Sequence, residues 1–335
     1  MARPHSQFWA FGLTYKVFDV SVRGLKADGL TGISGGFEVG SETLSTYQCG
    51  STTEFLDNAF RYPTRPNGAV DLNPPRALSS DAFGINGGIM VGDAQFGTEC
   101  NSRPHAGIWN LSSKVFIDLQ PVPPISGTER GTVALATDGV TQVGYGYDYA
   151  SVPHAFAWSG KAASILRLHG PPAIATGVSG KYIVGVTAAG KAILWSGTQG
   201  YYGSLPCPGC GSYAATGIDG IRAVGDGAVM GAVHALFWPH LDGVPIDLNS
   251  ASTASSSALA IRLTTEVGYA TPNGVSVPHA AVWNGSAQSY LDLHAFLPAG
   301  YTQSAADAVD ARGDVAGVAV DSSGVLHAIV WLIVP

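Results

Sequence analysis

The chain repeats one short phrase seven times. Each copy centres on a small or branched apolar residue followed by glycine, inside a segment with strand composition. These pairs are Val39-Gly40, Val91-Gly92, Val143-Gly144, Val184-Gly185, Val224-Gly225, Val267-Gly268 and Ala316-Gly317. Consecutive pairs are 40 to 52 residues apart. A repeat of this length without helical periodicity is typical of the four-stranded blades of a β-propeller.

The segment before each pair is built from small residues. Examples are Thr31-Gly32-Ile33, Ala82-Phe83-Gly84-Ile85, Ala215-Thr216-Gly217-Ile218 and Ala306-Asp307-Ala308-Val309. Glycine within a strand often marks a place where another backbone approaches closely. We therefore expect these segments to be the innermost strands, which crowd around the axis of the ring.

The segment after each pair ends in a recurring tryptophan. Five copies read His-Ala-x-x-Trp and begin at His105, His154, His234, His279 and His327. Two copies are degenerate and begin at Asn58 and Lys191. A tryptophan at one fixed strand position predicts a large buried contact between neighbouring sheets.

The fourth strand carries Asp-Leu in four units, at Asp71, Asp118, Asp247 and Asp292. The seventh unit ends at Trp331 without such a strand, whereas residues 15–22 near the N-terminus resemble one. We therefore predict an all-β, single-domain, seven-bladed propeller whose N-terminal strand closes the last blade, which removes open sheet edges. Six blades, eight blades or a two-sheet solenoid are the alternatives. The expected units are 28–76, 77–127, 128–170, 171–211, 212–252, 253–299 and 300–335.

Composition excludes several classes of partner. The formal net charge is −7 and no cluster of Lys and Arg occurs, which disfavours nucleic acid. No stretch reaches the roughly 18–20 apolar residues of a membrane span. Residues 1–4 lack the apolar core of a secretory signal, so the chain is either cytosolic or lacks a signal that was removed. We expect a monomer without a cofactor.

The four cysteines favour an oxidising compartment. Cys49 and Cys100 occupy the same connection in adjacent units, which predicts a disulfide between them. Cys207 and Cys210 form a Cys-x-x-Cys in an expected loop. We interpret this pair as a local disulfide, with free thiols or a metal site as alternatives, because zinc usually needs further ligands.

The repeated phrase resembles the extracellular HAF repeat of bacteria. His154-Ala155-Phe156 matches the name-giving triplet, and His-Ala opens four further copies. The resemblance covers about residues 28–335 and departs at Asn58, Lys191 and Ala316. It implies a propeller-type fold and a secreted or surface-attached protein. It implies no particular activity.

The recurring His and Asp are interpreted as structural, because one of each per blade lies spread around a ring. We expect each histidine to bond a nearby turn backbone, and we expect no metal site. The chain also lacks Gly-x-Ser-x-Gly, His-Glu-x-x-His, Walker and EF-hand motifs, which weakens hydrolase, metalloprotease and nucleotidase interpretations.

Function is expected where the repeat is broken, in the loops of one face. The long connections are Ser41–Asp57, Asp93–Pro104, Gln120–Gly131 and Tyr145–Pro153. In the last of these, Tyr145, Tyr147, Asp148 and Tyr149 suit sugar recognition. The candidate ligand-binding residues are Arg103, Arg130, Tyr145, Tyr147, Asp148, Tyr149 and Tyr269, and weak catalytic candidates are Asp93, Tyr147, Asp148, His169 and Asp226.

Three functions remain open at this point. The leading one is a secreted propeller that binds an extracellular glycan or partner through these loops. A second is a polysaccharide lyase or glycoside hydrolase on the same face, in which Asp93 and Asp226 form an acid/base pair or a Tyr/His/Arg set removes a proton. A third is a structural surface protein without a binding site.

Overall fold

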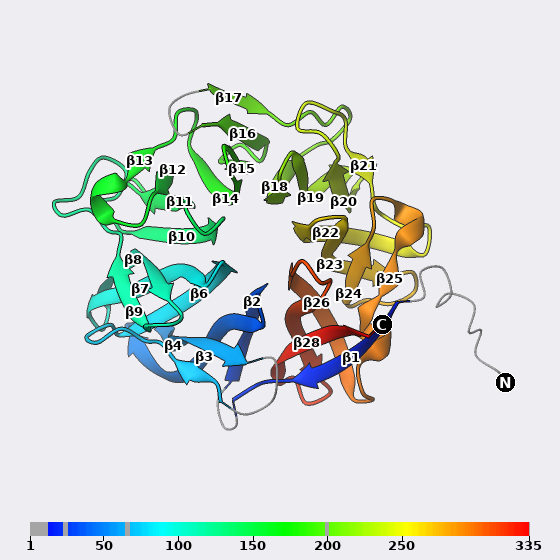
Figure 1. Cartoon of the computed structure of the whole chain (residues 1–335), viewed down its shortest axis with the longest axis horizontal. Helices are drawn as coiled ribbons and strands as arrows, with labels where there is room; N and C mark the ends of the chain where they lie inside the picture. The colour runs from blue at the N-terminus through cyan, green and yellow to red at the C-terminus, as the bar shows by residue number, and fades with distance from the viewer. Residues whose placement is uncertain (1–12, 23–25, 64–67, 198–200, 335) are drawn as a thin grey trace.

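The computed structural model describes residues 13–22, 26–63, 68–197 and 201–334. Seven antiparallel sheets of four strands each stand around a central axis (Figure 1). The predicted seven-bladed propeller is thus confirmed over six blades, eight blades or a solenoid. Within the described ranges the only helical segments are three short 3₁₀ turns, η1 (Ala162–Ser164), η2 (Ala287–Ser289) and η3 (Leu293–Phe296).

The blades follow one another along the chain. Blades 1 to 3 comprise β2 (Lys26–Ser34), β3 (Phe37–Cys49), β4 (Thr52–Pro63) and β5 (Val70–Asp71); β6 (Ser79–Asn86), β7 (Ile89–Thr98), β8 (Asn101–Asn110) and β9 (Val115–Asp118); and β10 (Thr132–Thr137), β11 (Gln142–Tyr147), β12 (Pro153–Trp158) and β13 (Leu166–Arg167). Blades 4 and 5 comprise β14 (Ala173–Ser179), β15 (Tyr182–Thr187), β16 (Ala192–Ser196) and β17 (Tyr201–Ser204); and β18 (Tyr213–Asp219), β19 (Arg222–Val229), β20 (Ala232–Trp238) and β21 (Ile246–Asp247). Blades 6 and 7 comprise β22 (Thr253–Arg262), β23 (Thr265–Pro272), β24 (His279–Trp283) and β25 (Leu291–Asp292); and β26 (Tyr301–Val309), β27 (Val315–Asp321), β28 (Leu326–Val334) and β1 (Thr14–Asp19).

The last blade is closed by the N-terminal strand, as predicted. β1 pairs antiparallel with β28, from Thr14 opposite Val334 to Asp19 opposite Ile329. The strand ends at Asp19 and not at residue 22. The reason is local, because the Asp19 carboxylate accepts hydrogen bonds from the backbone N–H and hydroxyl of Ser21 and turns the chain.

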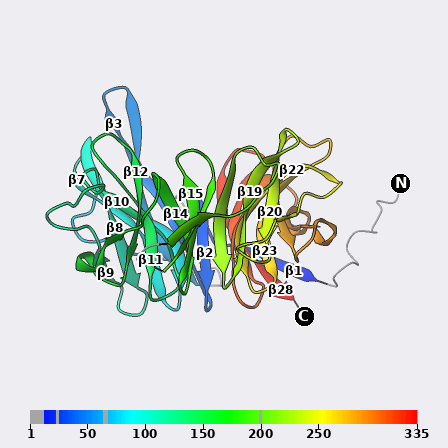
Figure 2. The ribbon, with the colours of Figure 1, turned by 90° about the horizontal axis from the view of Figure 1, so that it is seen from above.

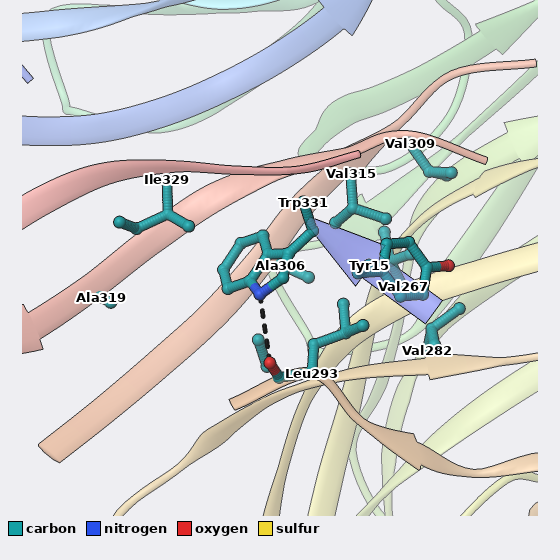
Figure 3. Close-up of a cluster of buried hydrophobic side chains, with 11 residues drawn as sticks. Tyr15, Val267, Val282, Leu293, Ala306, Val309, Val315, Ala319, Ile329 and Trp331 are labelled. Atoms are coloured by element: carbon teal, nitrogen blue, oxygen red, sulfur yellow. Dashed lines mark hydrogen bonds between the residues drawn. The ribbon is translucent and has the colours of Figure 1, made fainter. Parts of the chain in front are cut away.

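The recurring tryptophans hold neighbouring blades together. Six of them are less than 2% exposed, and five donate their indole N–H to a backbone carbonyl of the preceding blade. These bonds are Trp109 to Leu72, Trp158 to Leu119, Trp195 to His169, Trp238 to Pro206 and Trp331 to Leu293. Figure 3 shows Trp331 packed with Tyr15 and Val267 between blades 6 and 7. Five interfaces therefore combine a buried apolar contact with one directional bond.

The recurring His and Asp form a pair, and our expectation of a turn-backbone partner was wrong. In four blades the histidine Nδ1 lies 2.7–2.9 Å from the carboxylate on the neighbouring fourth strand. The pairs are His105–Asp118, His234–Asp247, His279–Asp292 and His327–Asp19. We call this contact the latch. In blade 7 it joins the two ends of the chain, because Asp19 lies on β1.

Two of the expected long loops are β-hairpins. The β3–β4 ladder continues to Cys49 opposite Thr52, and the β7–β8 ladder to Thr98 opposite Asn101. The repeat did not indicate these hairpins, because their strands continue beyond the strand length that the other units share. Figure 2 shows the β3 hairpin rising beyond the ring. The tips are joined by the predicted Cys49–Cys100 disulfide, and the predicted Cys207–Cys210 disulfide is also present.

Candidate functional site

The ring has two faces with different connections. Turns between first and second strands lie on one face, which we call the turn face. Connections between second and third strands, and from each fourth strand to the next blade, lie on the other, which we call the loop face. The antiparallel order of every blade imposes this separation. The sequence-predicted binding residues belong to the loop face.

Two tyrosines form an aromatic pair at the loop-face end of β11, the second strand of blade 3. Tyr145 and Tyr147 are two residues apart on one strand, so their side chains point to the same side. Their ring centroids are 5.2 Å apart at an interplanar angle of 73°, the edge-to-face geometry that aromatic quadrupoles favour. Tyr149 follows in the loop, is 76% exposed and stands outside this pair.

The loop beside the tyrosines is held by Asp148. Its Oδ1 accepts backbone N–H groups of Ala150 and Val152 at 2.8 and 2.9 Å, and its Oδ2 lies 3.1 Å from Nε2 of His154. The bond from Val152 and the neighbouring His154 lower the pKa of Asp148. The carboxylate therefore stays ionised while it shapes the loop.

Blade 3 replaces the latch with another arrangement. Arg167 stands where other blades carry the fourth-strand aspartate, and its Nη2 lies 2.6 Å from Nδ1 of His154. The guanidinium can only donate, so Nδ1 accepts and Nε2 carries the proton toward Asp148. In four other blades the equivalent histidine binds the fourth-strand aspartate, whereas His154 binds Asp148 in the loop after β11.

Two arginines belong to the segments that adjoin the loop-face end of β11. Arg103 on β8 donates from Nη1 to the carbonyl of Glu129 at 2.7 Å, and Arg130 donates from Nη1 to the hydroxyl of Ser151 at 2.5 Å. The backbone N–H of Arg130 also bonds the carbonyl of Tyr147. Within the described part of the chain neither guanidinium has a carboxylate partner. Arg103, Arg130, Tyr145, Tyr147 and Asp148 are thus connected through the Gln120–Gly131 loop and the end of β11, and we call this set the blade 3 surface.

A buried aspartate, Asp93, and a half-buried one, Asp81, face each other in blade 2. Asp93 on β7 is 4% exposed and stands directly opposite Asp81 on β6. Burial, and then the charge of Asp81, raises the pKa of Asp93 well above its usual range. Burial raises the pKa of Asp81 as well, against a hydrogen bond from Ser41. Burial, Tyr147 and Asp93 together raise the pKa of Tyr145 to about 12.

Sequence reasoning missed Asp81. Its position on the inner strand carries Gly29, Val133, Ile174, Ala214, Ser257 and Ala305 in the other blades. A single carboxylate in that series was the available signal. It was overlooked because the repeat was aligned on the residues that the copies share.

The remaining candidates lie apart from the blade 3 surface. Asp226 is in blade 5, where it accepts a hydrogen bond from Ser257 at 2.6 Å, so it does not pair with Asp93 of blade 2. Tyr269 is half-buried in blade 6. The side chain of His169 is exposed, and its carbonyl accepts the indole N–H of Trp195.

Among the residues that the structure describes, no three His, Cys, Asp or Glu side chains are grouped so as to hold a metal ion. No helix in those ranges is long and apolar enough to cross a membrane.

Comparison with known proteins identifies the fold. No family model matches the chain, and no curated protein matches it. Among solved structures, the β-propeller domain of the Trilobed protease from Pyrococcus furiosus superposes with a TM-score of 0.59 at 9% identity, over 92% of this chain and 93% of that one. That domain is described as having an open velcro topology, whereas β1 closes the ring here.

Two further similar structures are enzymes. Oligogalacturonate lyase from Vibrio parahaemolyticus superposes with a TM-score of 0.58 at 10% identity, over 95% of this chain and 96% of that one. Pyrococcus horikoshii acylaminoacyl peptidase gives 0.62 at 10% identity over 92% of this chain. The chain matches only 51% of that peptidase. At these identities the similarity concerns the propeller fold alone.

Proposed function

We propose that this protein is an extracellular propeller that binds a glycan through the blade 3 surface. The observation that carries the proposal is the Tyr145–Tyr147 edge-to-face pair, together with Arg103 and Arg130 in the adjoining segments, neither of which has a carboxylate partner among the described residues. The two disulfides and the resemblance to the bacterial extracellular HAF repeat support an oxidising, extracellular setting. Although the whole chain is acidic, this surface presents cationic groups.

The chemistry of the surface suits an acidic sugar chain. Aromatic faces and edges pack against the C–H groups of sugar rings, and the raised pKa of Tyr145 keeps its hydroxyl neutral and able to donate. A guanidinium offers two parallel N–H groups to a carboxylate. We therefore propose that the preferred glycan carries carboxylate groups.

Affinity electrophoresis through gels that contain alginate, hyaluronate or dextran tests this proposal. We expect retardation by at least one acidic polysaccharide and none by dextran. Tyr147→Ala should weaken retention about tenfold, or ~1.4 kcal/mol. Thr271→Ala is the matched control, because Thr271 occupies the same strand position in blade 6. Equal retention of both variants, or of all three polymers, would refute the proposed surface.

Glycoside hydrolysis is a second candidate, favoured by the adjacent Asp81 and Asp93. A carboxyl kept protonated by burial can serve as a general acid. A lyase that uses Tyr145 as base is disfavoured, since a phenol whose pKa is about 12 is a poor acceptor of protons. Mass spectrometry of the soluble polymers distinguishes these functions. Intact polymers support binding alone, whereas new oligosaccharides that disappear with Asp93→Asn indicate hydrolysis.

A further inference from the structure

A cavity lies on the axis of the ring, away from the blade 3 surface. It has a volume of about 790 Å³ and is lined by the inner strands of all seven blades and by their turns on the turn face. This volume falls within the ~300–1,000 Å³ range of small-molecule sites. The cavity is thus large enough for an organic ligand and separate from the proposed glycan site.

A β-bulge in every inner strand re-aims one residue at this cavity. Opposite the Val-Gly or Ala-Gly pair of each second strand, the pairing register skips one residue of the inner strand, and these seven residues line the cavity. Three are threonines that donate to a carbonyl of the next blade, namely Thr31, Thr176 and Thr216. Three are Phe83, Leu135 and Leu259, and the seventh is Asp307. Asp307 is the one ionisable group in this ring.

The other charged side chains that line the cavity already have ion-pair or hydrogen-bond partners within the protein. Arg262 pairs with Asp219 at 3.3 Å, and Arg312 pairs with Asp310 and Asp314 at 3.2 and 3.0 Å. The carboxylate of Asp138 accepts backbone N–H groups of Val140, Thr141 and Gly180. These groups therefore need no ligand.

Asp307, in contrast, has neither a hydrogen bond nor an ion pair within the described ranges. Burial raises the pKa of its carboxyl to about 7, because an ionised group without a partner is costly in a medium of low polarity. Aliphatic side chains also line the cavity, among them Ile85, Val178 and Ile218. The site thus combines one uncompensated carboxylate with an apolar wall.

We propose that the axial cavity binds a small organic ammonium compound, whose cationic group pairs with Asp307 and whose apolar body lies against the aliphatic wall. The bound cation supplies the hydrogen-bond donors and the positive charge that the Asp307 carboxylate lacks within the described ranges. The cavity opens on the turn face, so such a ligand and the glycan occupy opposite faces of the ring.

Isothermal titration of the full chain at pH 8 with benzylammonium, and with benzyl alcohol as the uncharged counterpart, tests this assignment. We expect benzylammonium to bind at least tenfold more tightly, and Asp307→Asn to abolish the difference. Asp307→Thr gives an independent variant, since threonine occupies this position in three blades. Equal binding of the two probes by the unmodified chain, or a preference that survives in either folded variant, would overturn the proposal. Retention of both variants on acidic polysaccharide should be unchanged, which separates this test from that of the glycan site.

Discussion

Blades 3 and 6 are built on the same scaffold and differ where blade 3 carries the proposed binding surface. Both contain His-Ala-x-x-Trp followed by a 3₁₀ turn, in which Ser164 or Ser289 accepts the N–H of the residue after the tryptophan. Tyr145 and Tyr269 occupy the same position after the central glycine. The shared tryptophan and serine therefore lie in the core and in the turns that shape each sheet, whereas the shared tyrosine is half-buried on the second strand.

The differences lie on the fourth strand and at the loop-face end of the second strand. Blade 6 has the latch between His279 and Asp292, whereas blade 3 has Arg167 at the aspartate position. Blade 3 also has Tyr147 where blade 6 has Thr271. The comparison teaches that the repeat constrains the positions that pack blades together. Residues on the fourth strand and at the end of the second strand can change without altering the blade, so a binding surface can arise at these positions.

The largest expected effect concerns the shared core. Trp158→Ala and Trp283→Ala should each lower the free energy of unfolding by about 3–5 kcal/mol, because both indoles are fully buried. Chemical denaturation followed by circular dichroism measures this. A cost below 1 kcal/mol in either blade would contradict a common core.

The conservative Trp→Phe substitution sharpens the same comparison. Trp158 donates to the carbonyl of Leu119, whereas the buried N–H of Trp283 has no hydrogen-bond partner among the described residues. Trp158→Phe should therefore cost roughly 1 kcal/mol more than Trp283→Phe. Equal costs would mean that the indole bond contributes nothing to the interface.

Exchange of the edge residues should have an intermediate effect. Asp292→Arg removes the bonds to His279 and to the backbone N–H of His294, so we expect a loss of about 1–3 kcal/mol. The reciprocal Arg167→Asp change in blade 3 should leave stability within about 1 kcal/mol, because His154 regains a carboxylate partner of the kind found in the other blades. Thermal and chemical unfolding of both variants check this asymmetry, and it fails if both lose the same amount.

The smallest expected effect depends on pH. It concerns two buried residues, Glu266 and Gln142, that occupy equivalent positions in blades 6 and 3. Glu266 in blade 6 accepts the N–H of Gly285, and Gln142 in blade 3 accepts that of Gly160. Burial raises the pKa of Glu266 from 4.5 to about 7. The folded state thus binds the proton more tightly, so this contribution to stability is complete below pH 4.5 and is lost as pH rises through 7.

Glu266→Gln should remove that pH dependence. Its stability relative to the unmodified chain should rise between pH 5 and pH 8, as measured by chemical denaturation at each pH. Gln142→Glu is the matched control and should introduce the same dependence into blade 3. A difference between Glu266→Gln and the unmodified chain that stays constant with pH would show that Glu266 does not titrate in this range.

Much of the fold could be predicted because its determinants are local and repeated. The Val-Gly pairs, the tryptophans and the displaced fourth strand at Asp19 identify seven blades and their closure. The Cys49–Cys100 disulfide followed from equivalent positions in adjacent units. The length of the two hairpins could not be predicted in the same way, because pairing beyond the repeat depends on strands that have no counterpart in other blades.

The site was less accessible to sequence reasoning. Tyr145, Tyr147, Asp148, Arg103 and Arg130 were predicted as candidates, but their contacts depend on how the Gln120–Gly131 loop folds against blade 3. Asp226 and Asp93 looked equivalent in the repeat, yet they lie in different blades with different partners.

The sequence by itself determined the blade, the number of blades and the place where the ring closes, because a period of strands and a recurring tryptophan specify these locally. Only the tertiary structure decided which of the residues that differ between repeat units come into contact. Asp81 faces Asp93 because two strands pair in one register, and Asp307 lines the axial cavity because a bulge aims it there. Both outcomes depend on packing between strands and blades, which a linear repeat does not encode residue by residue.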